Sequence, residues 1–346
     1  MTMPDIQPLV SVQIVVRNGE RFIRHCLDSV RAQIYMSTEV VVLDNNSDDS
    51  TANIIASEYP EFRLIRRDNN LGMWPGQEML LSHTRGLYVL VLSVDVILDP
   101  QFIANAVAAC ERDITIAAVQ GKIFQYSLPQ LETDNLKLTT AVIDTCGFGM
   151  TRSRKVLNIG HGQPDGPYCA STHDIFGVEG AAPFFRRSAL EDCRVEGKLI
   201  DTDYFWYGDD LDLAWRMTLF GHRQVFVPCA VAWHDRSTTK GAATSLAGHL
   251  ARLRVRRAIP LRKRRLDWSN VRFTIIKNDY ILNLLRDAPW ILAREMATLL
   301  YALAIEPGIL LEAGRFFALL PRMLKRRHAI MRRAVISART MHQWFT

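Results

Sequence analysis

The chain has 346 residues, which allows two domains or one large domain with additions. With 48% hydrophobic and 23% charged residues, its composition excludes disorder, collagen and coiled coil as descriptions of the whole chain. The net charge of +6 conceals a division, because the residues from His249 onward contain 20 Lys and Arg but only 6 Asp and Glu. We therefore expect an acidic globular body followed by a basic region.

The six cysteines are scattered and include no C-x-x-C pair. This pattern predicts neither a zinc site nor a dense disulfide framework, and it favours a reducing compartment. The apolar stretch near the N-terminus lacks a preceding basic region and a small-residue cleavage site, so we interpret it as a first strand rather than a signal peptide. Because no uninterrupted apolar run reaches 18 residues, we expect no transmembrane helix.

Strand and helix patterns alternate over the first 120 residues. Short runs of apolar and β-branched residues predict strands at 10–16, 39–43, 63–66 and 88–92. Apolar spacing and capping residues predict helices at 20–33, 51–59 and 76–84, and another that opens at Asp99-Pro100. This order indicates a parallel sheet, on which ligands bind at the carboxyl ends of the strands. Asn18, Asp44 and Asp95 follow predicted strands and mark that edge as a candidate site.

The middle of the chain is less regular. Residues 121–178 show no clear period, and an acidic, aromatic segment at 201–220 runs into a helix. A further strand is predicted at 224–233 and ends at His234. The imidazole therefore joins the polar groups expected at strand ends.

From about residue 248 onward, basic clusters alternate with apolar helical segments at 291–305 and 309–323. Helices of about 15 residues cover about 22 Å, short of the roughly 30 Å hydrocarbon core. They can instead lie in the interface, with Lys and Arg against anionic headgroups. The alternatives are packing on the body of the protein or an oligomer interface. We divide the chain into a sheet domain at 1–247 and a basic, amphipathic helical region at 248–346 that associates with a membrane.

Two carboxylates at predicted strand ends suit a nucleotide ligand. Asp44 opens an Asn- and Ser-rich loop and can hydrogen-bond a base or ribose. Asp95 follows a strongly apolar strand, where a carboxylate can hold a divalent cation between diphosphate oxygens. Taken singly, either residue could equally be a loop or helix-capping carboxylate.

A third candidate is the acidic run at Asp209, Asp210 and Asp212. Three neighbouring carboxylates repel one another unless something uses or neutralises them. Asp212 and Arg216 have the i,i+4 spacing of a helical ion pair, and the first two aspartates could simply oppose a helix dipole. Against this local explanation, the aromatic residues 204–207 come directly before, and aromatic surface beside carboxylates can seat a sugar and a catalytic base.

With these residues in view, positions 9 to about 237 resemble the family 2 glycosyltransferases of the GT-A fold, in particular the rhamnosyltransferase-like bacterial branch. The motifs that carry the resemblance occur in the family's order: the first strand and helix with Asn18-Gly19-Glu20, Val41 to Thr51 around Asp44, Asn69-Asn70-Leu71-Gly72, Ser93-Val94-Asp95 at the D-x-D position, Gly180-Ala181 with Phe185-Arg186-Arg187, Asp209-Asp210-Leu211-Asp212-Leu213 with Arg216, and Pro228 with His234.

The resemblance implies an α/β fold with a GT-A type mainly parallel sheet flanked by helices and an α-helical C-terminal extension. The residues that would bind the donor nucleotide are Asn18, Glu20, Asp44, Asn46, Asn70, Gly72 and Asp95. Asp95 and His234 would hold Mg²⁺ or Mn²⁺, and Asp210, with Asp209 beside it, is the expected catalytic base. The residues expected on the acceptor side are Gly180, Ala181, Trp206, Tyr207, Asp212 and Arg216.

The sequence departs from the family pattern at three places. Ser93 replaces the first carboxylate of the D-x-D position, Asp209 replaces the more common Glu, and Gln77-Glu78 stand where an Asn is expected. A catalytically inactive nucleotide-sugar-binding or scaffold protein is therefore the alternative to an enzyme.

The leading hypothesis is an inverting glycosyltransferase. It would move a sugar such as rhamnose from a nucleotide diphosphate to a hydroxyl of a lipid-linked glycan in bacterial cell-surface polysaccharide synthesis. The basic region would hold the enzyme on the cytoplasmic face of the plasma membrane by its anionic lipids. Nucleic acid is the less favoured partner, because the basic residues interleave with apolar segments. An oligomer is compatible with the pattern.

Overall fold

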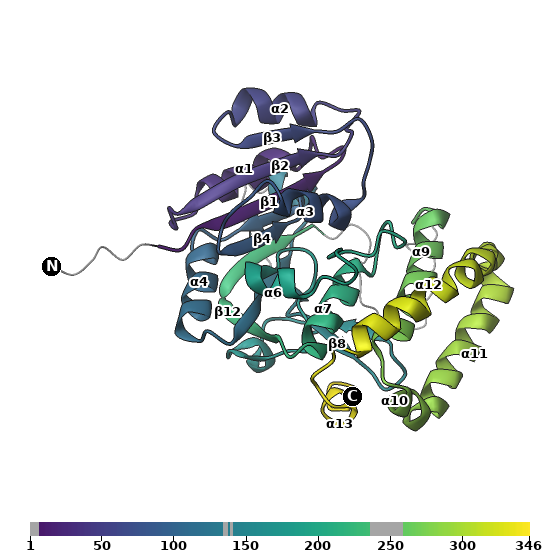
Figure 1. The fold of residues 1–346 in the computed structure, drawn as a ribbon. Coiled ribbons are helices and arrows are strands. Elements are labelled where there is room, and N and C mark those ends of the chain that lie inside the picture. The colour runs from purple at the N-terminus through teal and green to yellow at the C-terminus, as the bar shows by residue number, and fades with distance from the viewer. Residues whose placement is uncertain (1–6, 134–137, 139–140, 236–258) are drawn as a thin grey trace.

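The computed structural model describes residues 7–133, 138, 141–235 and 259–346. A ten-stranded mixed sheet with helices packed along it forms the body, and the C-terminal helices gather at one side (Figure 1). The domain boundary predicted at residues 247/248 and the basic residues at 252–257 lie outside the described residues.

The first four strands are parallel and have the predicted βαβ connections. The strands are β1 (Val10–Val16), β2 (Thr38–Asp44), β3 (Arg63–Arg66) and β4 (Tyr88–Leu92), and the helices that follow them in turn are α1 (Ile23–Arg31), α2 (Thr51–Glu58), α3 (Met73–Leu81) and α4 (Phe102–Arg112). All seven residues of β1 are buried, as expected for a strand covered on both faces. Val16 pairs with Asp44, and Asp44 with Arg66, so the loops after these strands meet at one edge.

The remaining strands of the sheet are β5 (Val96–Leu98), β6 (Ile116–Gln125), β7 (Ile143–Thr145), β10 (His173–Asp174), β11 (Phe184–Arg186) and β12 (Arg223–His234). The sequence pattern misses β6 because Gln120 and Lys122 interrupt its apolar run. Both side chains are buried yet partnered: Gln120 Oε1 accepts a hydrogen bond from the Glu179 N–H at 2.7 Å, and Lys122 Nζ contacts Asp165 at 2.8 Å. These partners make a polar strand compatible with the interior.

The strand order is β10-β12-β6-β11-β4-β1-β2-β3, with β5 paired to β12 and β7 paired to β6. β11 is antiparallel to both of its neighbours, whereas β6 and β12 are parallel. The pairing of β5 with β12 sets Val96 opposite His234. A distant strand end is thereby brought beside the loop that follows β4. A separate two-stranded sheet is formed by β8 (Phe148–Met150) and β9 (Val156–Asn158).

Short helical elements fill the middle of the chain: α5 (Leu128–Thr133), η1 (Pro167–Cys169), α6 (Arg187–Asp192) and α7 (Asp209–Leu219). Cys146 and Cys169 form a disulfide, and the other four cysteines are free thiols. The region thus contains one bridge, which the scattered cysteine pattern did not indicate.

The C-terminal region contains α9 (Leu261–Asn278), α10 (Ile281–Arg286), α11 (Ala288–Ile305), η2 (Pro307–Glu312), α12 (Ala313–Met331) and α13 (Ala338–His342). The boundaries predicted for its apolar helices were wrong. α11 begins three residues before the predicted 291, and the segment predicted at 309–323 is divided between η2 and the start of α12. Pro321 lies within α12, where a proline lacks the backbone N–H that donates to the preceding turn.

Much of the described C-terminal region packs on the sheet domain. Phe345 is buried against Trp215 of α7 and Phe176, with ring centroids 5.7 Å and 6.3 Å apart. Arg154 forms ion pairs with Asp279 at 2.6 Å and Asp287 at 2.8 Å, and all three side chains are fully buried. These contacts attach the segment around α10 and the end of the helical group to the body.

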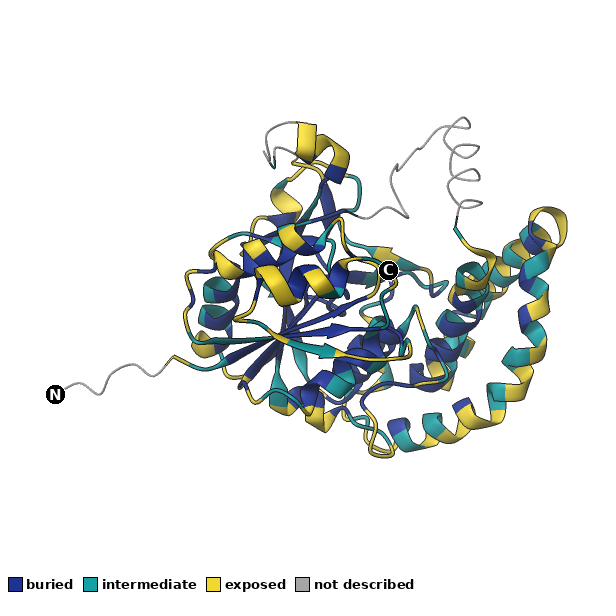
Figure 2. Ribbon diagram, turned by 90° about the horizontal axis from the view of Figure 1, so that it is seen from above, coloured by how far each residue is buried: buried dark blue, intermediate teal, exposed yellow. Residues whose placement is uncertain are grey.

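By contrast, α11 is mostly exposed, and the outer part of the helical group is largely uncovered (Figure 2). Within the described ranges, α11 is the one helix whose length and composition would allow it to cross a membrane. From the sequence we expected no such helix, because Arg294 and Glu295 interrupt the apolar run.

Candidate active site

The loops at the carboxyl ends of β2 and β3 are joined by Asn45. This residue is buried, and its Nδ2 donates to Asn70 Oδ1 at 2.9 Å and to the Gly72 carbonyl at 3.1 Å. Its Oδ1 accepts from the Leu71 N–H at 2.8 Å. Asn70 and Gly72 were predicted to bind the donor, whereas Asn45 was missed. Its one signal in the sequence was its place directly after Asp44.

The loops after β1 and β2 are also held together by side chains. Asn18 Oδ1 accepts from the Asp48 N–H at 2.8 Å, and Glu20 Oε2 accepts from the Ser50 N–H at 2.9 Å. Asn18 and Asn46 have positive φ angles of 54° and 68°, a conformation that asparagine tolerates better than most residues.

Asp44 is buried at the end of β2, and its Oδ1 accepts from the Ser47 N–H at 3.2 Å. The structure therefore places Asn18, Glu20, Asp44 and Asn46 in adjoining loops at the same sheet edge. Such an edge can present carboxylate and amide groups to a nucleotide.

Asp95 and His234 face each other across the β5–β12 pairing. The distance from His234 Nε2 to Asp95 Oδ2 is 3.4 Å, and His234 Nδ1 contacts Asp144 Oδ2 at 2.8 Å. Burial by itself lowers the pKa of His234, but Asp95 and Asp144 outweigh it and raise that pKa to about 10. For Asp95, burial by itself raises the pKa of the carboxyl group. The interaction with His234 outweighs burial and lowers that pKa below its ordinary value.

This pair fits a divalent cation that is shared with a substrate. In the described part of the chain, no group of three or more His, Cys, Asp or Glu side chains is arranged to hold a metal. A carboxylate and an imidazole can nevertheless supply two ligands while substrate phosphates and water supply the rest. Asp144 on the far nitrogen of His234 is the outer-shell carboxylate that commonly orients a metal-binding histidine. A bound cation would require His234 to lose its proton.

Beside this pair lies a pocket that contains several of the predicted residues. Its lining comprises Met73, Trp74, Ser93, Glu179, Gly180, Ala181, Trp206, Tyr207, Asp210 and His234. The last six of these residues were predicted as site residues from the sequence, and Ser93 was noted at the D-x-D position. Met73, Trp74 and Glu179 were missed. Residues from five separate segments thus converge on one cavity, which brings the predicted base close to the predicted metal ligands.

The structure separates the two neighbouring carboxylates at the start of α7. Asp210 lines the pocket, whereas Asp209 is buried. Burial, with further contributions from Asp210 and Asp212, raises the pKa of Asp209 well above its ordinary value. Gly180 leaves room for the Asp210 carboxylate, since a Cβ at position 180 would lie 2.8 Å from Asp210 Oδ2.

The aromatic loop before α7 has a strained backbone that α9 supports. Phe205, Tyr207 and Gly208 have φ angles of 61°, 68° and 81°. Asn270 of α9 donates from Nδ2 to the carbonyl oxygens of Trp206 and Tyr207, both at 2.8 Å. A residue more than sixty positions further along the chain therefore holds the loop that leads to Asp210.

Gly72 makes a second contact with this loop. With a φ of 90°, Gly72 adopts a conformation that favours glycine, and a Cβ there would lie 2.4 Å from the Phe205 carbonyl oxygen. The donor-side turn and the aromatic loop thus touch through their backbones. Tyr207 and Trp206, which were predicted on the acceptor side, line the pocket, and Trp206 is 43% exposed.

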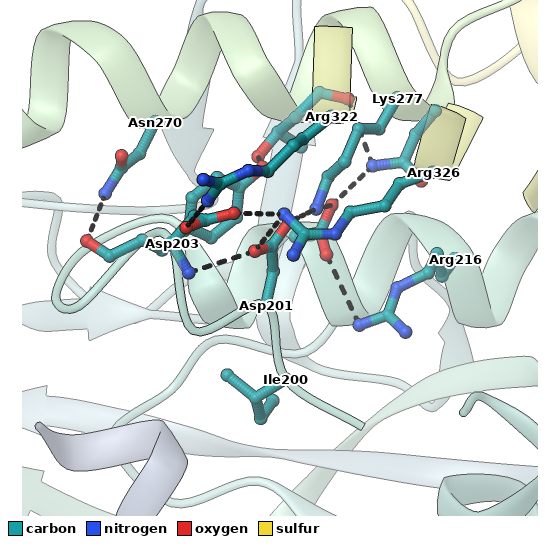
Figure 3. Close-up of polar contacts among 12 residues, drawn as sticks. Ile200, Asp201, Asp203, Arg216, Asn270, Lys277, Arg322 and Arg326 are labelled. Carbon is teal, nitrogen blue, oxygen red and sulfur yellow. Dashed lines mark hydrogen bonds and ion pairs between the residues drawn. The ribbon is translucent and has the colours of Figure 1, made fainter. Parts of the chain in front are cut away.

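Asp212 and Arg216 lie outside the set of residues that line this pocket. Both are buried, and Arg216 Nη2 contacts Asp212 Oδ2 at 3.3 Å, which confirms the i,i+4 pairing. Lys277 of α9 contacts Asp212 at 3.0 Å and Asp201 at 2.8 Å, and Arg326 of α12 contacts Asp201 at 2.7 Å (Figure 3). In this structure Asp212 links α7 to α9, whereas Arg216 donates to the carbonyl oxygens of Cys193 and Leu199.

The fold and the site together define a glycosyltransferase of the GT-A class. The family model "Glycosyl transferase family 2" matches residues 11–192, and the chain belongs to this family.

Among curated proteins, the chain is 28% identical to a chondroitin synthase of Pasteurella multocida over 150 residues, which are 39% of this chain and 15% of that protein. It is also 28% identical to the putative glycosyltransferase EpsH of Bacillus subtilis over 115 residues, which are 32% of this chain and 33% of that protein. The chain therefore matches a third or less of the length of these relatives.

Solved structures support the same fold along nearly the whole chain. A mannosyltransferase of Pyrobaculum calidifontis in complex with GDP-mannose and Mn²⁺ has a TM-score of 0.52 at 20% identity, with 95% of this chain and 87% of that chain covered. Residues 1–349 of TarS from S. aureus have a TM-score of 0.53 at 14% identity, with 97% and 90% covered. At these identities the likeness establishes the fold.

Proposed function

We propose that this glycosyltransferase transfers a sugar from a nucleotide diphosphate donor to an acceptor hydroxyl with inversion, and that Asp210 is the general base. The observation that carries the proposal is one pocket lined by both Asp210 and His234, with Asp95 3.4 Å from the imidazole. A carboxylate base and a candidate diphosphate-binding histidine that line the same cavity suit attack on the anomeric carbon of a bound donor.

The donor would lie along the carboxyl ends of the strands. Asp44 would accept a hydrogen bond from the base, and the loops containing Asn18 and Asn70 would enclose the nucleoside. Asp95 and His234 would hold Mg²⁺ or Mn²⁺, which neutralises charge on the departing diphosphate. On the acceptor side, Trp206 and Tyr207 offer ring surface for a sugar. Asp210 would take the proton of the attacking hydroxyl at a carboxylate oxygen.

The alternative remains an inactive nucleotide-sugar-binding or scaffold protein, since Ser93 stands at the first D-x-D carboxylate position. Two observations favour an active enzyme. Ser93 Oγ donates to Asp95 Oδ1, so the serine orients the remaining carboxylate. Asp144 also fixes the orientation of His234, as an outer carboxylate commonly does for a metal-binding histidine.

We expect release of nucleoside diphosphate from one donor of a panel containing dTDP-rhamnose, GDP-mannose and UDP-N-acetylglucosamine, and we expect it to require Mn²⁺ or Mg²⁺. dTDP-rhamnose is the first choice because of the sequence resemblance, and the other two are suggested by donors named for structural neighbours. His234→Ala should remove most of the metal-dependent turnover, since one of two protein ligands is lost. The measurement is the rate of nucleoside diphosphate release with and without EDTA.

Thr115→Ala is a suitable control, because Thr115 is exposed and remote from the strand ends that form the site. Undiminished turnover in EDTA, or wild-type turnover of His234→Ala, would disprove the metal assignment. Donor binding without turnover of any donor would favour the scaffold alternative.

We also propose that the enzyme works on the cytoplasmic face of an anionic membrane, where a lipid-linked glycan would present its hydroxyl. Support comes from large apolar side chains that the described C-terminal helices leave exposed: Ile281, Leu282, Leu285, Trp290, Leu292, Met296, Leu299, Leu300, Leu303, Leu311 and Phe317. An exposed apolar surface of this extent is unusual unless a partner or membrane covers it.

The charged residues of α11 point back to the body of the protein. Arg294 donates to the Arg154 carbonyl at 2.5 Å, and Glu295 contacts Arg272 of α9 at 2.5 Å. The helix is thereby attached along its polar side, and its apolar side is left for a partner. Such a helix suits the membrane interface, where each nearby Lys or Arg, such as exposed Arg286, contributes on the order of 1 kcal/mol.

The full chain is expected to float with anionic liposomes at low salt and to be partly released at high salt. Since the described C-terminal helices pack on the body, point substitutions are a better test than truncation. Leu292→Asp combined with Leu300→Asp should abolish flotation, because charges on the buried side of an interfacial helix oppose insertion.

Met36→Asp combined with Ile114→Asp is the matched control, since these side chains are 81% and 75% exposed outside the C-terminal region. Absence of flotation by the unmodified chain at low salt would refute the membrane proposal and favour packing or an oligomer interface.

A further inference from the structure

Lys263 lies in the first turn of α9, outside the segment that matches the family model. Its Nζ is 4.3 Å from the ring centre of Tyr207 and 4.7 Å from that of Trp206. Both rings line the pocket that contains Asp210 and His234. The ammonium group is therefore held against the wall of the candidate active site.

The contacts of this ammonium group do not neutralise it. Within the part of the chain that the structure describes, the ammonium group lies against two aromatic faces, which attract a cation but carry no net charge. Burial lowers the pKa of Lys263 to about 8, against the opposite influence of Asp267 on the same helix and Asp95 at the end of β4.

A half-buried cation beside a candidate diphosphate site can attract the negative charge of the diphosphate. The neighbouring residue Arg262 lies over the ring of Phe205, with its Cζ 4.5 Å from the ring centre. Phe205 is not among the residues that line the pocket. Position along the helix thus separates two adjacent cations: Lys263 contacts two rings that line the pocket, whereas Arg262 contacts a ring that does not. The aromatic pair also fixes the Lys263 side chain, which reduces the entropy lost when it binds an anion.

We infer that Lys263 binds the diphosphate of the nucleotide-sugar donor and neutralises the departing nucleoside diphosphate together with the metal. The inference rests on the proposed function. With only Asp95 and His234 as protein ligands, the cation site depends on the substrate for its remaining ligands. An ammonium group from α9 supplies additional positive charge, and it couples donor binding to the helix that also holds the aromatic loop through Asn270.

The test measures dissociation constants of the full chain by calorimetry for UDP, GDP and dTDP and for the matching nucleosides. Lys263→Met removes the charge and keeps an unbranched apolar chain over the rings. We expect it to raise the dissociation constant of the preferred diphosphate by about 10- to 100-fold, the usual effect of losing a charge-assisted hydrogen bond. Nucleoside affinity should not change, because a nucleoside lacks the diphosphate.

Lys263→Arg should restore most of the diphosphate affinity, and Arg262→Met should leave it unchanged. Equal weakening of diphosphate and nucleoside by Lys263→Met would show a structural role and overturn the inference. An unaltered diphosphate affinity would overturn it as well, while metal-dependent turnover by the unmodified enzyme would leave the proposed function standing. If the unmodified chain binds none of the three diphosphates, both proposals fail.

Discussion

Replacement of Asp210 by Asn is expected to lower turnover by about 10²- to 10⁴-fold, the usual contribution of a general base. The amide keeps the size of the side chain and can still accept a hydrogen bond from the Leu211 N–H, which contacts Asp210 Oδ1 at 2.8 Å. It cannot accept the proton of an acceptor hydroxyl. Donor affinity should be retained, because the predicted diphosphate ligands Asp95 and His234 are untouched. Steady-state turnover and calorimetric donor binding distinguish the two effects.

Asp209→Asn provides the matched control one residue away. Because burial raises the pKa of Asp209 well above its ordinary value, this side chain holds a proton more readily than an exposed aspartate, and Asn is close in shape and charge to the neutral acid. We expect turnover within a few-fold of the unmodified enzyme. A severe loss in Asp209→Asn together with an active Asp210→Asn would move the base to Asp209.

Lys277→Met is expected to destabilise the protein by about 3–5 kcal/mol, the range found when one member of a buried ion pair is removed. The Lys277 side chain is buried between Asp201 and Asp212, at 2.8 Å and 3.0 Å. Its removal leaves Asp212 with Arg216 and Asp201 with Arg326, one cation fewer for the same buried carboxylates. The midpoint of thermal unfolding should fall clearly.

The control is Lys325→Met on α12. Lys325 contacts Glu196 at 2.8 Å, but its side chain is 75% exposed, so water can replace the contact. We expect little change in the unfolding midpoint. Similar small shifts in both variants would mean that the buried ion network makes no net contribution to the attachment of α9 and α12 to α7.

Sequence periodicity was sufficient for the parallel half of the fold. The apolar runs of β1 and β4 have the length and composition of strands buried on both faces, so their identity does not depend on distant contacts. The strand β6 could not be recognised in the same way. Its buried Gln120 and Lys122 are compatible with a central strand only because Glu179 and Asp165, far along the chain, supply their partners.

Sequence by itself also determined the membership of a glycosyltransferase family, because its motifs are local. A carboxylate directly after an apolar strand, as at Asp44 or Asp95, must lie at the carboxyl edge of a parallel sheet wherever the sheet is placed. The spacing of strands and helices therefore located the candidate donor edge before any tertiary contact was known.

Only the tertiary structure distinguished Asp209 from Asp210. Adjacent residues on a helix point about 100° apart, and nothing in the local sequence says which direction faces solvent. In the fold, where α9 packs against α7, Asp209 is buried and Asp210 lines the pocket. The same long-range packing decided that Asn270 and Lys263 contact the aromatic loop, since contacts between segments more than fifty residues apart leave no periodic trace in a single sequence.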